Sequence, residues 1–441
     1  MERTLIKELA THVGKKVAVA GWIAVRRDQG KMVFIDLRDR SGMVQGVILP
    51  SEAAITAGKE ARVEYVVEAE GVVNKRPEKN VNPDVLNGDI ELQVQHLTIL
   101  SVAEIPFELG SELNIDTYLD HQPYTLRSKR SKEIFKVQET ILEAFRASLK
   151  HDDFTEFQAP AIVGGDAEGG AAAFEVAYHY NQKAFLATSP QFYKQIMVGV
   201  YERAFSTPKV FRGEKHSTPR HLNEYSSMDF EMGFIKDHRD VMKVLERAIR
   251  KALRAVEERH AATLAKMNPE GTPLLPAEIP VLKLREAQRL LGVGDEPDLE
   301  PEHERALCEW AKKEKGSDFV FVTHYPAAKR PFYTYEDEAD HGFTKSFDLL
   351  FRGLEITTGG QRIHNHDLLV EKIKSRGMDP GKFAFYLEAF KVGMPPHGGS
   401  ATGLERITAR MLNLPNVKEA TLFPRDLNRI DLLLSTDEPK A

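Results

Sequence analysis

The length of 441 residues exceeds that of one ordinary domain and predicts two or three. Apolar residues make up 42% of the chain and charged residues 29%, a balance typical of a globular protein with a large core. The net charge of -6 means that any nucleic-acid partner must be held by a local basic patch. The sequence has neither a long apolar run nor a signal-like first segment, so we expect a cytoplasmic protein without a membrane partner. Cys308, the single cysteine, excludes an internal disulfide and a cysteine-based zinc site.

The first part of the chain alternates short apolar runs with turn residues, which predicts a series of strands. The expected strands are Val17–Trp22, Met32–Arg38, Met43–Leu49, Tyr65–Val73 and Ile90–Ile99. Five strands this short are typical of a small closed barrel of the oligonucleotide-binding (OB) type, which we assign to residues 1–102.

Basic residues and an aromatic residue are interleaved on this expected barrel. Arg26, Arg27 and Lys31 border the strand that carries Phe34, and Gln45 follows on the next strand. Cations for phosphates beside an aromatic for base stacking favour single-strand binding. The alternative, in which Phe34 belongs to the core and the arginines lie in a solvated loop, is equally compatible with the pattern.

Residues 103–127 contain no convincing long element and are expected to form a linker. Apolar spacing then predicts a helix over 131–150, and a strand over 154–161 ends near Pro160. This helix and strand could form a dimer contact or simply pack on the core. Residues 236–320 are charged, mostly helical and broken by prolines, which suggests an insertion.

The later strands are expected over 319–323 and 346–358, and a helix over 382–394 precedes a Pro-Pro-His-Gly-Gly turn. Strands drawn from such distant segments predict an α+β domain over 128–441 with a mixed, mainly antiparallel sheet. The phosphate-binding patterns GxxxxGK[ST] and GxGxxG are absent from the sequence.

The segment 210–234 carries an unusual density of opposite charges in the outline of a hairpin. Arg212 ends the first strand, and Arg220 and His221 follow a polar loop, so the cations could grip both ends of a triphosphate. A solvated surface hairpin is the alternative.

Four further clusters carry candidate chemistry. Glu168 precedes two glycines, so its carboxylate could hold an ammonium group. Gln191 and Lys194 lie one helical turn apart and face the same way.

In the third cluster, Glu355 and Thr358 precede a glycine turn and Arg362. They offer the one or two protein oxygens that suffice for a Mg²⁺ ion bound to phosphates. The fourth cluster, 395–406, is a glycine-rich turn before a helix that starts near Gly403 and carries Arg406.

These clusters occur together in a characteristic order. Phe-Arg-x-Glu, then Arg-His, then Gly-x-Glu-x-x-x-Gly-Gly, then Gly-x-x-Arg resembles motifs 2 and 3 of the class II aminoacyl-tRNA synthetases. The segments SPQFYKQIM, FDLLFRGLEITTGGQRIH and GMPPHGG are similar to the archaeal-type aspartyl-tRNA synthetases, a group that includes a second bacterial form. The barrel segment resembles the anticodon-binding domain of the same subgroup, so the likeness covers about residues 15–430.

The resemblance implies the roles of individual residues. Arg212 would bridge the amino-acid carboxylate and the α-phosphate of ATP as the principal catalytic residue. The ATP site implied by the family consists of Arg212, Glu214, Arg220, His221, Leu222, Tyr225, Glu355, Gly403 and Arg406. The aspartate site implied by the family consists of Glu168, Gln191, Lys194, Arg212, Asp229, Thr358 and Arg362. Glu355 and Thr358 would contact Mg²⁺, with assistance from Asp348.

We interpret the two cations at the substrate side chain, Lys194 and Arg362, as favouring a carboxylate, because an amide would leave positive charge uncompensated. Aspartate is therefore preferred to asparagine, and Asp229 agrees, since asparaginyl relatives tend to carry Glu there. An asparaginyl-tRNA synthetase and a non-catalytic RNA-binding paralogue remain the alternatives.

The resemblance also implies a homodimer and places tRNA contacts on the barrel, at Ala24, Arg26, Arg27, Phe34, Gln45 and Pro77. Enzymes restricted to tRNA(Asp) tend to carry Trp and Lys where this chain has Ala24 and Pro77. Small or rigid replacements remove contacts that reject the wrong base, so we expect activity on tRNA(Asn) as well as tRNA(Asp). Gly213, Lys215 and Ser400 depart from the usual family pattern.

Overall fold

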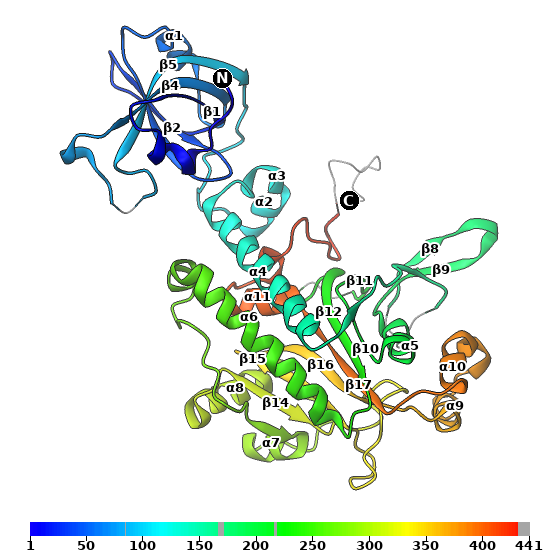
Figure 1. Cartoon of the computed structure of the whole chain (residues 1–441). Coiled ribbons are helices and arrows are strands. Elements are labelled where there is room, and N and C mark those ends of the chain that lie inside the picture. Colours follow the sequence, from blue (N-terminus) through cyan, green and yellow to red (C-terminus); the bar gives the residue numbers. More distant parts are fainter. Residues whose placement is uncertain (84, 166–171, 216–217, 431–441) are drawn as a thin grey trace. The chain divides into compact units, whose positions relative to one another are not determined.

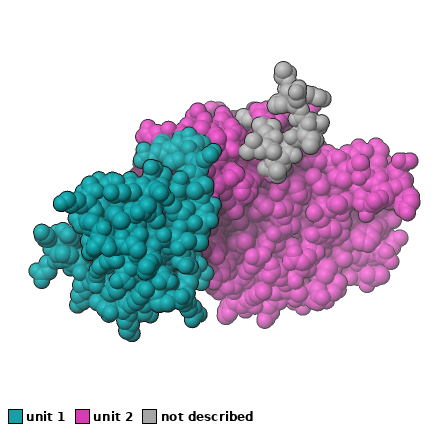
Figure 2. Space-filling model, turned by 90° about the horizontal axis from the view of Figure 1, so that it is seen from above, with its two compact units in different colours: residues 1–111 teal, residues 112–441 magenta. Residues whose placement is uncertain are grey.

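The computed structural model describes residues 1–83, 85–165, 172–215 and 218–430, and the chain divides into two compact units. Figure 2 colours these units, Met1–Ser111 and Glu112–Ala441, separately. No helix in the described part of the chain has both the length and the apolar character that a membrane span requires.

The first unit is a closed five-stranded barrel, as the sequence predicted, with the strand order β1-β2-β3-β5-β4. Figure 1 draws this unit in blue. Its strands are β1 (Lys16–Asp28), β2 (Val33–Arg38), β3 (Met43–Ile48), β4 (Val66–Lys75) and β5 (Ile90–Ser101). Short helical segments accompany them: η1 (Ile6–His12), α1 (Ile55–Glu60) and η2 (Glu78–Asn80). Val33, Ile35 and Leu37 alternate along β2 and are fully buried in the barrel core.

The second unit is built on a mixed sheet whose order in the described residues is β13-β14-β15-β16-β17-β12-β10-β6, with β11 paired to β12. Within the described part of this sheet only β13/β14 and β10/β6 pair in parallel, so the sheet is mainly antiparallel, as expected. Its strands are β6 (Thr155–Glu156), β10 (Arg203–Ser206), β11 (Lys209–Phe211), β12 (Glu224–Gly233), β13 (Val281–Lys283), β14 (Phe319–Thr323), β15 (Ser346–Phe351), β16 (Leu354–Arg362) and β17 (His397–Gly403).

A small sheet, β7 (Ile162–Val163), β9 (Lys183–Leu186) and β8 (Glu175–Ala177), lies apart from the main one. The helices of this unit are α2 (Ile115–Asp120), α3 (Gln122–Thr125), α4 (Lys129–His151), α5 (Gln191–Tyr201), α6 (His238–Met267), α7 (Leu284–Leu291), α8 (Pro301–Lys315), α9 (His366–Ser375), α10 (Ala384–Lys391) and α11 (Leu404–Met411). The 3-10 segments are η3 (His179–Asn181), η4 (Pro380–Phe383) and η5 (Val417–Ala420).

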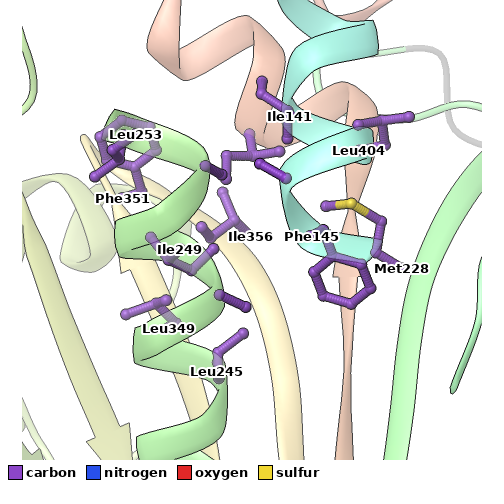
Figure 3. Packing of buried hydrophobic residues seen from close by; sticks show 14 of the residues in the cluster. Ile141, Phe145, Met228, Leu245, Ile249, Leu253, Leu349, Phe351, Ile356 and Leu404 are labelled. Carbon is purple, nitrogen blue, oxygen red and sulfur yellow. The ribbon is translucent and has the colours of Figure 1, made fainter. Parts of the chain in front are cut away.

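Helices cover both faces of this sheet near β14. Phe319 and Phe321 share a core with α4 and α6, whereas the alternate residues Val320 and Val322 pack with α7 and α8. Figure 3 shows the first of these cores, where α4 and α6 bring apolar side chains such as Phe145 against the strands. Packing on both faces fixes the strands that carry the polar residues described below.

The expected insertion over 236–320 is wrong for most of its length. Helix α6 buries Val241, Leu245, Ile249 and Val256 in the main core, and β13 joins the main sheet. Charged residues stand between these apolar positions in the sequence, so the apolar stripe of α6 was not recognised. The segment is therefore part of the framework of the domain.

Three other boundaries differ from the expectation. Helices α2 and α3 occupy the end of the supposed linker 103–127, and buried Gln122 bonds the backbone of Thr421 and Phe423 within the second unit. The single strand expected over 346–358 is a hairpin, because a tight turn at Arg352 and Gly353 reverses the chain. The strand expected over 154–161 is reduced to β6.

One buried histidine makes the stability of this unit depend on pH. Burial, with a further contribution from the neighbouring His324 ring, lowers the pKa of His238 from 6.5 to about 4. A depressed histidine pKa stabilises the fold fully above pH 6.5, and this contribution is lost as the pH falls towards 4. The loss amounts to about 3 kcal/mol from the shift.

We expect His238→Phe to remove the part of the pH dependence that His238 contributes and to leave the part due to His397, whose pKa burial also lowers to about 4. The substitution breaks no hydrogen bond of Nδ1 of His238, which has no partner among the described residues. The measurement is urea unfolding at pH 7 and pH 4.5, followed by Trp310 fluorescence in a Trp22→Phe background. His151→Phe, at an exposed position on α4, should keep the parent pH dependence. An unchanged pH dependence in His238→Phe would contradict the assignment.

Candidate active site

A cavity of about 480 Å³ opens between the β11–β12 hairpin, α5 and the strands β15–β17. It collects most of the residues that the sequence singled out, from segments more than 200 positions apart. The predicted residues that line it are Gln191, Lys194, Arg212, Glu214, Arg220, His221, Leu222, Tyr225, Glu355, Thr358, Arg362, Gly403 and Arg406. The alternative of a solvated surface hairpin is therefore wrong.

Among the described residues that were predicted for the site, Asp229 and Asp348 do not line the cavity. Asp229 lies fully buried below it and bonds Lys194. Glu168 lies outside the described residues, so its expected contact with the substrate ammonium group stays a prediction.

Four buried charges form a network under one end of the cavity. The Lys194 ammonium lies 2.9 Å from Oδ2 of Asp229 and 3.3 Å from Oε2 of Glu231. Arg362 Nε donates to Oε1 of Glu231 over 2.9 Å. Burial alone would raise the pKa of Glu231, but the Arg362 and Lys194 cations outweigh it and hold this pKa below its ordinary value.

This network overturns one step of the sequence argument. Lys194 and Arg362 were expected to need a substrate carboxylate, yet Asp229 and Glu231 already supply two negative charges. The sum of the four charges is zero, so uncompensated positive charge does not by itself select aspartate. Glu231 was missed, although its spacing from Asp229 puts both on one face of β12.

Uncharged side chains hold Gln191 in position beside this network. Gln191 Nε2 donates to Gln195 Oε1 over 2.9 Å, and Gln195 in turn lies 2.8 Å from Nε2 of His397. Burial lowers the pKa of His397 to about 4, so its ring is neutral at physiological pH. A neutral ring adds no third cation to the pocket.

The opposite end of the cavity is formed by the hairpin. Arg212 and Asn223 exchange hydrogen bonds of 2.8 Å across the strand ends, which fixes the position from which the Arg212 guanidinium projects. The central carbon of this guanidinium lies 5.7 Å from the centre of the Tyr225 ring. Nη1 of Arg212 lies 4.0 Å from Oε1 of Glu214. A cation held over an aromatic face beside a carboxylate suits a nucleotide with a charged phosphate end.

Arg220 reaches the cavity with its guanidinium bonded to Glu304 of α8. Burial raises the pKa of Glu304 to about 7, although the Arg220 cation opposes the shift. The sequence offered no local signal for Glu304, because it lies in the segment interpreted as an insertion.

A bulge in β16 brings two candidate metal ligands together. In a regular strand Glu355 and Thr358 would face opposite ways, but the pairing with β15 shifts between Leu349 and Leu350, which inserts one residue. Thr358 Oγ1 therefore donates to Glu355 Oε1 over 3.1 Å. Arg406 Nη1 bonds the Glu355 carbonyl over 2.9 Å.

Asp348 pairs with Thr358 across the same strands and could complete a cation site. Its Oδ2 receives a 2.7 Å bond from Arg330, whereas Oδ1 is buried without a hydrogen-bond partner among the described residues. Burial raises the pKa of Asp348 to about 6 against the attraction of Arg330. No cluster of three or more His, Cys, Asp or Glu suited to a metal occurs in the described residues. These few oxygens fit a Mg²⁺ ion that keeps phosphate oxygens and waters among its ligands.

The glycine-rich segment 395–406 differs in part from its prediction. The helix that carries Arg406, α11, begins at Leu404 with Gly403 as its N-cap, as expected. The expected turn is instead strand β17, paired between β12 and β16. Likewise Gly359 and Gly360 lie within β16 and form no turn.

The barrel separates the residues proposed to meet single-stranded RNA. Phe34 is half-buried on the outer face, opposite the core residues of β2, so the core alternative for Phe34 is wrong. Arg27 pairs with Phe34 across β1 and β2, and Gln45 lies two positions from the Phe34 pair on β3. Arg26 points to the other side and bonds backbone carbonyls of α1, including that of Gly58 at 3.1 Å.

Ala24 sits at a bulge in β1, and Pro77 is exposed at the start of η2. The side chains described on this barrel surface thus offer one aromatic and one cation side by side. Both arginines also have partners within this unit, since Arg26 bonds α1 carbonyls and Arg27 bonds the Asp36 carboxylate.

The chain matches two known families. Residues 114–427 match tRNA synthetases class II (D, K and N), and residues 17–100 match the OB-fold nucleic acid binding domain. The chain belongs to the class II tRNA synthetases of the D, K and N group. Among similar proteins, aspartate--tRNA(Asp/Asn) ligase of Thermus thermophilus is 44% identical over 97% of this chain and 99% of its own length. Aspartate--tRNA(Asp) ligase of Thermococcus kodakarensis is 38% identical over 95% and 96%.

The solved structure of asparaginyl-tRNA synthetase from Pyrococcus horikoshii complexed with asparaginyl-adenylate is also similar to this synthetase. It is 30% identical, with a TM-score of 0.89, over 98% of this chain and 99% of the other. The residues that line the cavity lie within the part of the chain that matches the synthetase family.

We expect Glu231→Gln to destabilise this synthetase by about 3–5 kcal/mol, because the change removes the negative charge that compensates buried Arg362. The measurement is the free energy of unfolding in urea by Trp310 fluorescence. Glu224→Gln, on the same strand at a partly exposed position, is the matched control and should change little. A loss below about 1 kcal/mol in Glu231→Gln would show that the network does not depend on this charge.

Proposed function

We propose that this chain ligates L-aspartate to tRNA(Asp), and also to tRNA(Asn), through an aspartyl-adenylate formed from ATP. The observation that carries the proposal is the near full-length similarity to aspartate--tRNA(Asp/Asn) ligases, combined with a single cavity lined by the charged residues of both substrate halves.

The cavity residues suit a reaction in which both nucleophiles come from the substrates. The aspartate α-carboxylate attacks the α-phosphate of ATP, which releases pyrophosphate, and the terminal ribose hydroxyl of tRNA then takes the aminoacyl group. The protein needs only to position the reactants and neutralise charge. Arg212, which projects from the hairpin into the cavity, is proposed to stabilise the negative charge that develops on the α-phosphate.

The remaining ATP contacts are proposed for other residues of the cavity. Glu214 accepts from the adenine amino group, and Tyr225 and Arg406 hold the ring. Arg220, with His221 beside it, meets the outer phosphates. Leu222 and Gly403 contribute backbone to this wall.

We expect Glu355 and Thr358, with Asp348 beside them, to hold Mg²⁺, which neutralises phosphate charge when bound. The buried, unbonded Oδ1 of Asp348 supports this expectation.

The aspartate half comprises Gln191, Asp229 and Glu168 around the ammonium group, and Lys194 and Arg362 at the side-chain carboxylate. The relatives named above favour aspartate. Asparagine is the second candidate, because the charges around Lys194 and Arg362 already balance.

The tRNA is proposed to meet the barrel at Arg26, Arg27, Phe34 and Gln45. Ala24 and Pro77 would provide no contact that rejects the third anticodon base of tRNA(Asn), so this tRNA would also be bound. We also expect a homodimer formed through α4 and β6, which sedimentation analysis can test.

The decisive assay crosses aspartate and asparagine with transcripts of both tRNAs. We expect charging with aspartate on both transcripts and no charging with asparagine. Charging of the tRNA(Asp) transcript alone would contradict dual specificity but leave aspartate activation intact. Pyrophosphate exchange that depends on asparagine and not aspartate would identify the second candidate instead.

Substitution of Arg212 by alanine should abolish measurable adenylate formation, a loss of about 10²–10³-fold or more, because a positioned charge donor at the transition state is removed. Aspartate-dependent pyrophosphate exchange measures this step. Binding of tRNA to Arg212→Ala, followed by filter retention, should be retained and serves as the control for folding. Exchange within threefold of the parent would exclude Arg212 as the catalytic residue.

A further inference from the structure

Glu304 lies outside every motif that identifies the family site, yet it contacts two of its walls. It is the fourth residue of α8, buried with 8% of its surface exposed, and it does not line the cavity. Buried carboxylates are rare unless their bonds are satisfied by specific partners.

One oxygen of Glu304 connects the two sides of the site. Its Oε2 accepts from the Arg220 guanidinium and, over 3.3 Å, from the backbone N–H of Glu355. Arg220 belongs to the hairpin side and Glu355 to β16. Helix α8 is fixed independently, since Leu307 and Ala311 are fully buried against the sheet.

The charged neighbours of Glu304 include arginines and one carboxylate, Glu355, which raises the pKa of Glu304 whereas Arg220 lowers it. Burial lowers the pKa of Arg410 on α11, the neighbouring Arg220 lowers it further, and Glu304 opposes the shift. Glu304 is therefore the carboxylate that lets two arginines lie close together at the base of the phosphate wall. Without it, Arg220 would lose its anchor and face a repulsive neighbour.

We propose that Glu304 is a positioning residue for ATP: it holds Arg220 toward the cavity and ties this arginine to the strand that carries Glu355. The inference rests on the proposed function, in which Arg220 meets the outer phosphates. A pre-oriented arginine loses less side-chain freedom when the triphosphate binds, so the anchor should act on ATP affinity.

Glu304→Gln keeps the size of the side chain and removes its charge. We expect the KM for ATP in aspartate-dependent pyrophosphate exchange to rise about tenfold, with kcat reduced less than threefold, because the contact is made in both the ground and the transition state. The KM for aspartate should stay unchanged. Glu304→Asp, which restores the charge, should recover part of the affinity, and Glu309→Gln, exposed on the same helix, should behave as the parent.

A double-mutant cycle separates positioning from a merely structural role. If Glu304 acts through Arg220, Glu304→Gln should have no further effect on the KM for ATP in an Arg220→Ala background. Additive effects, or a KM within twofold of the parent in Glu304→Gln, would overturn the proposal. If Glu304→Gln and Glu304→Asp both fail to fold, Glu304 is a structural residue and the proposal is likewise overturned.

Direct ATP binding, measured by isothermal titration calorimetry without aspartate or tRNA, tests the role of Glu304 separately from the proposed function. Weaker binding in Glu304→Gln than in the parent supports the positioning role whichever amino acid is activated. If Glu304→Gln and the parent bind ATP equally well, and the parent shows aspartate-dependent exchange, the Glu304 inference is wrong and the proposed function stands.

Discussion

The structure of the catalytic unit depends on a compensated set of buried charges. Lys194, Asp229, Glu231 and Arg362 lie within hydrogen-bond or ion-pair distance under the cavity, on α5, β12 and β16. Taking four charges out of water is costly unless each has partners in fixed positions. Those positions are fixed by a sheet that is packed on both faces, so the core and the charge network require each other.

Space for this network comes from glycine on the neighbouring strand. A side chain at Gly399 would place its Cβ only 2.2 Å from Oε2 of Glu231 and 2.1 Å from the Phe230 carbonyl. The glycines of β17 therefore form a strand and not a turn, and their lack of side chains lets Glu231 lie close to the β17 backbone. Gly213, a departure from the family pattern, has a similar reason, because a Cβ there would lie 2.8 Å from the Ala172 carbonyl. Nothing in the structure explains Lys215.

The two ends of the cavity differ in how their charges are held. At the amino-acid end every cation described above has an internal anionic partner, so selectivity must arise from geometry and from small differences in hydrogen bonding. At the proposed phosphate end each arginine also has a carboxylate partner, but burial raises the pKa of two of these carboxylates, Glu304 and Asp348. Where such a carboxylate is protonated, its arginine can pair with an incoming polyanion instead, which agrees with the triphosphate proposed for this end.

The sequence by itself determined the barrel, the mainly antiparallel sheet and about half of the residues that line the cavity, because local alternation, helical spacing and motif order record these features directly. It could not reveal that α6 is a core helix, since its charged surface masked a narrow apolar stripe. Only the tertiary structure decided which charges compensate one another. Glu231 and Glu304 meet their partners across 131 and 84 positions of chain, and pairing at such separations is set by strand register, a bulge in β16 and helix packing.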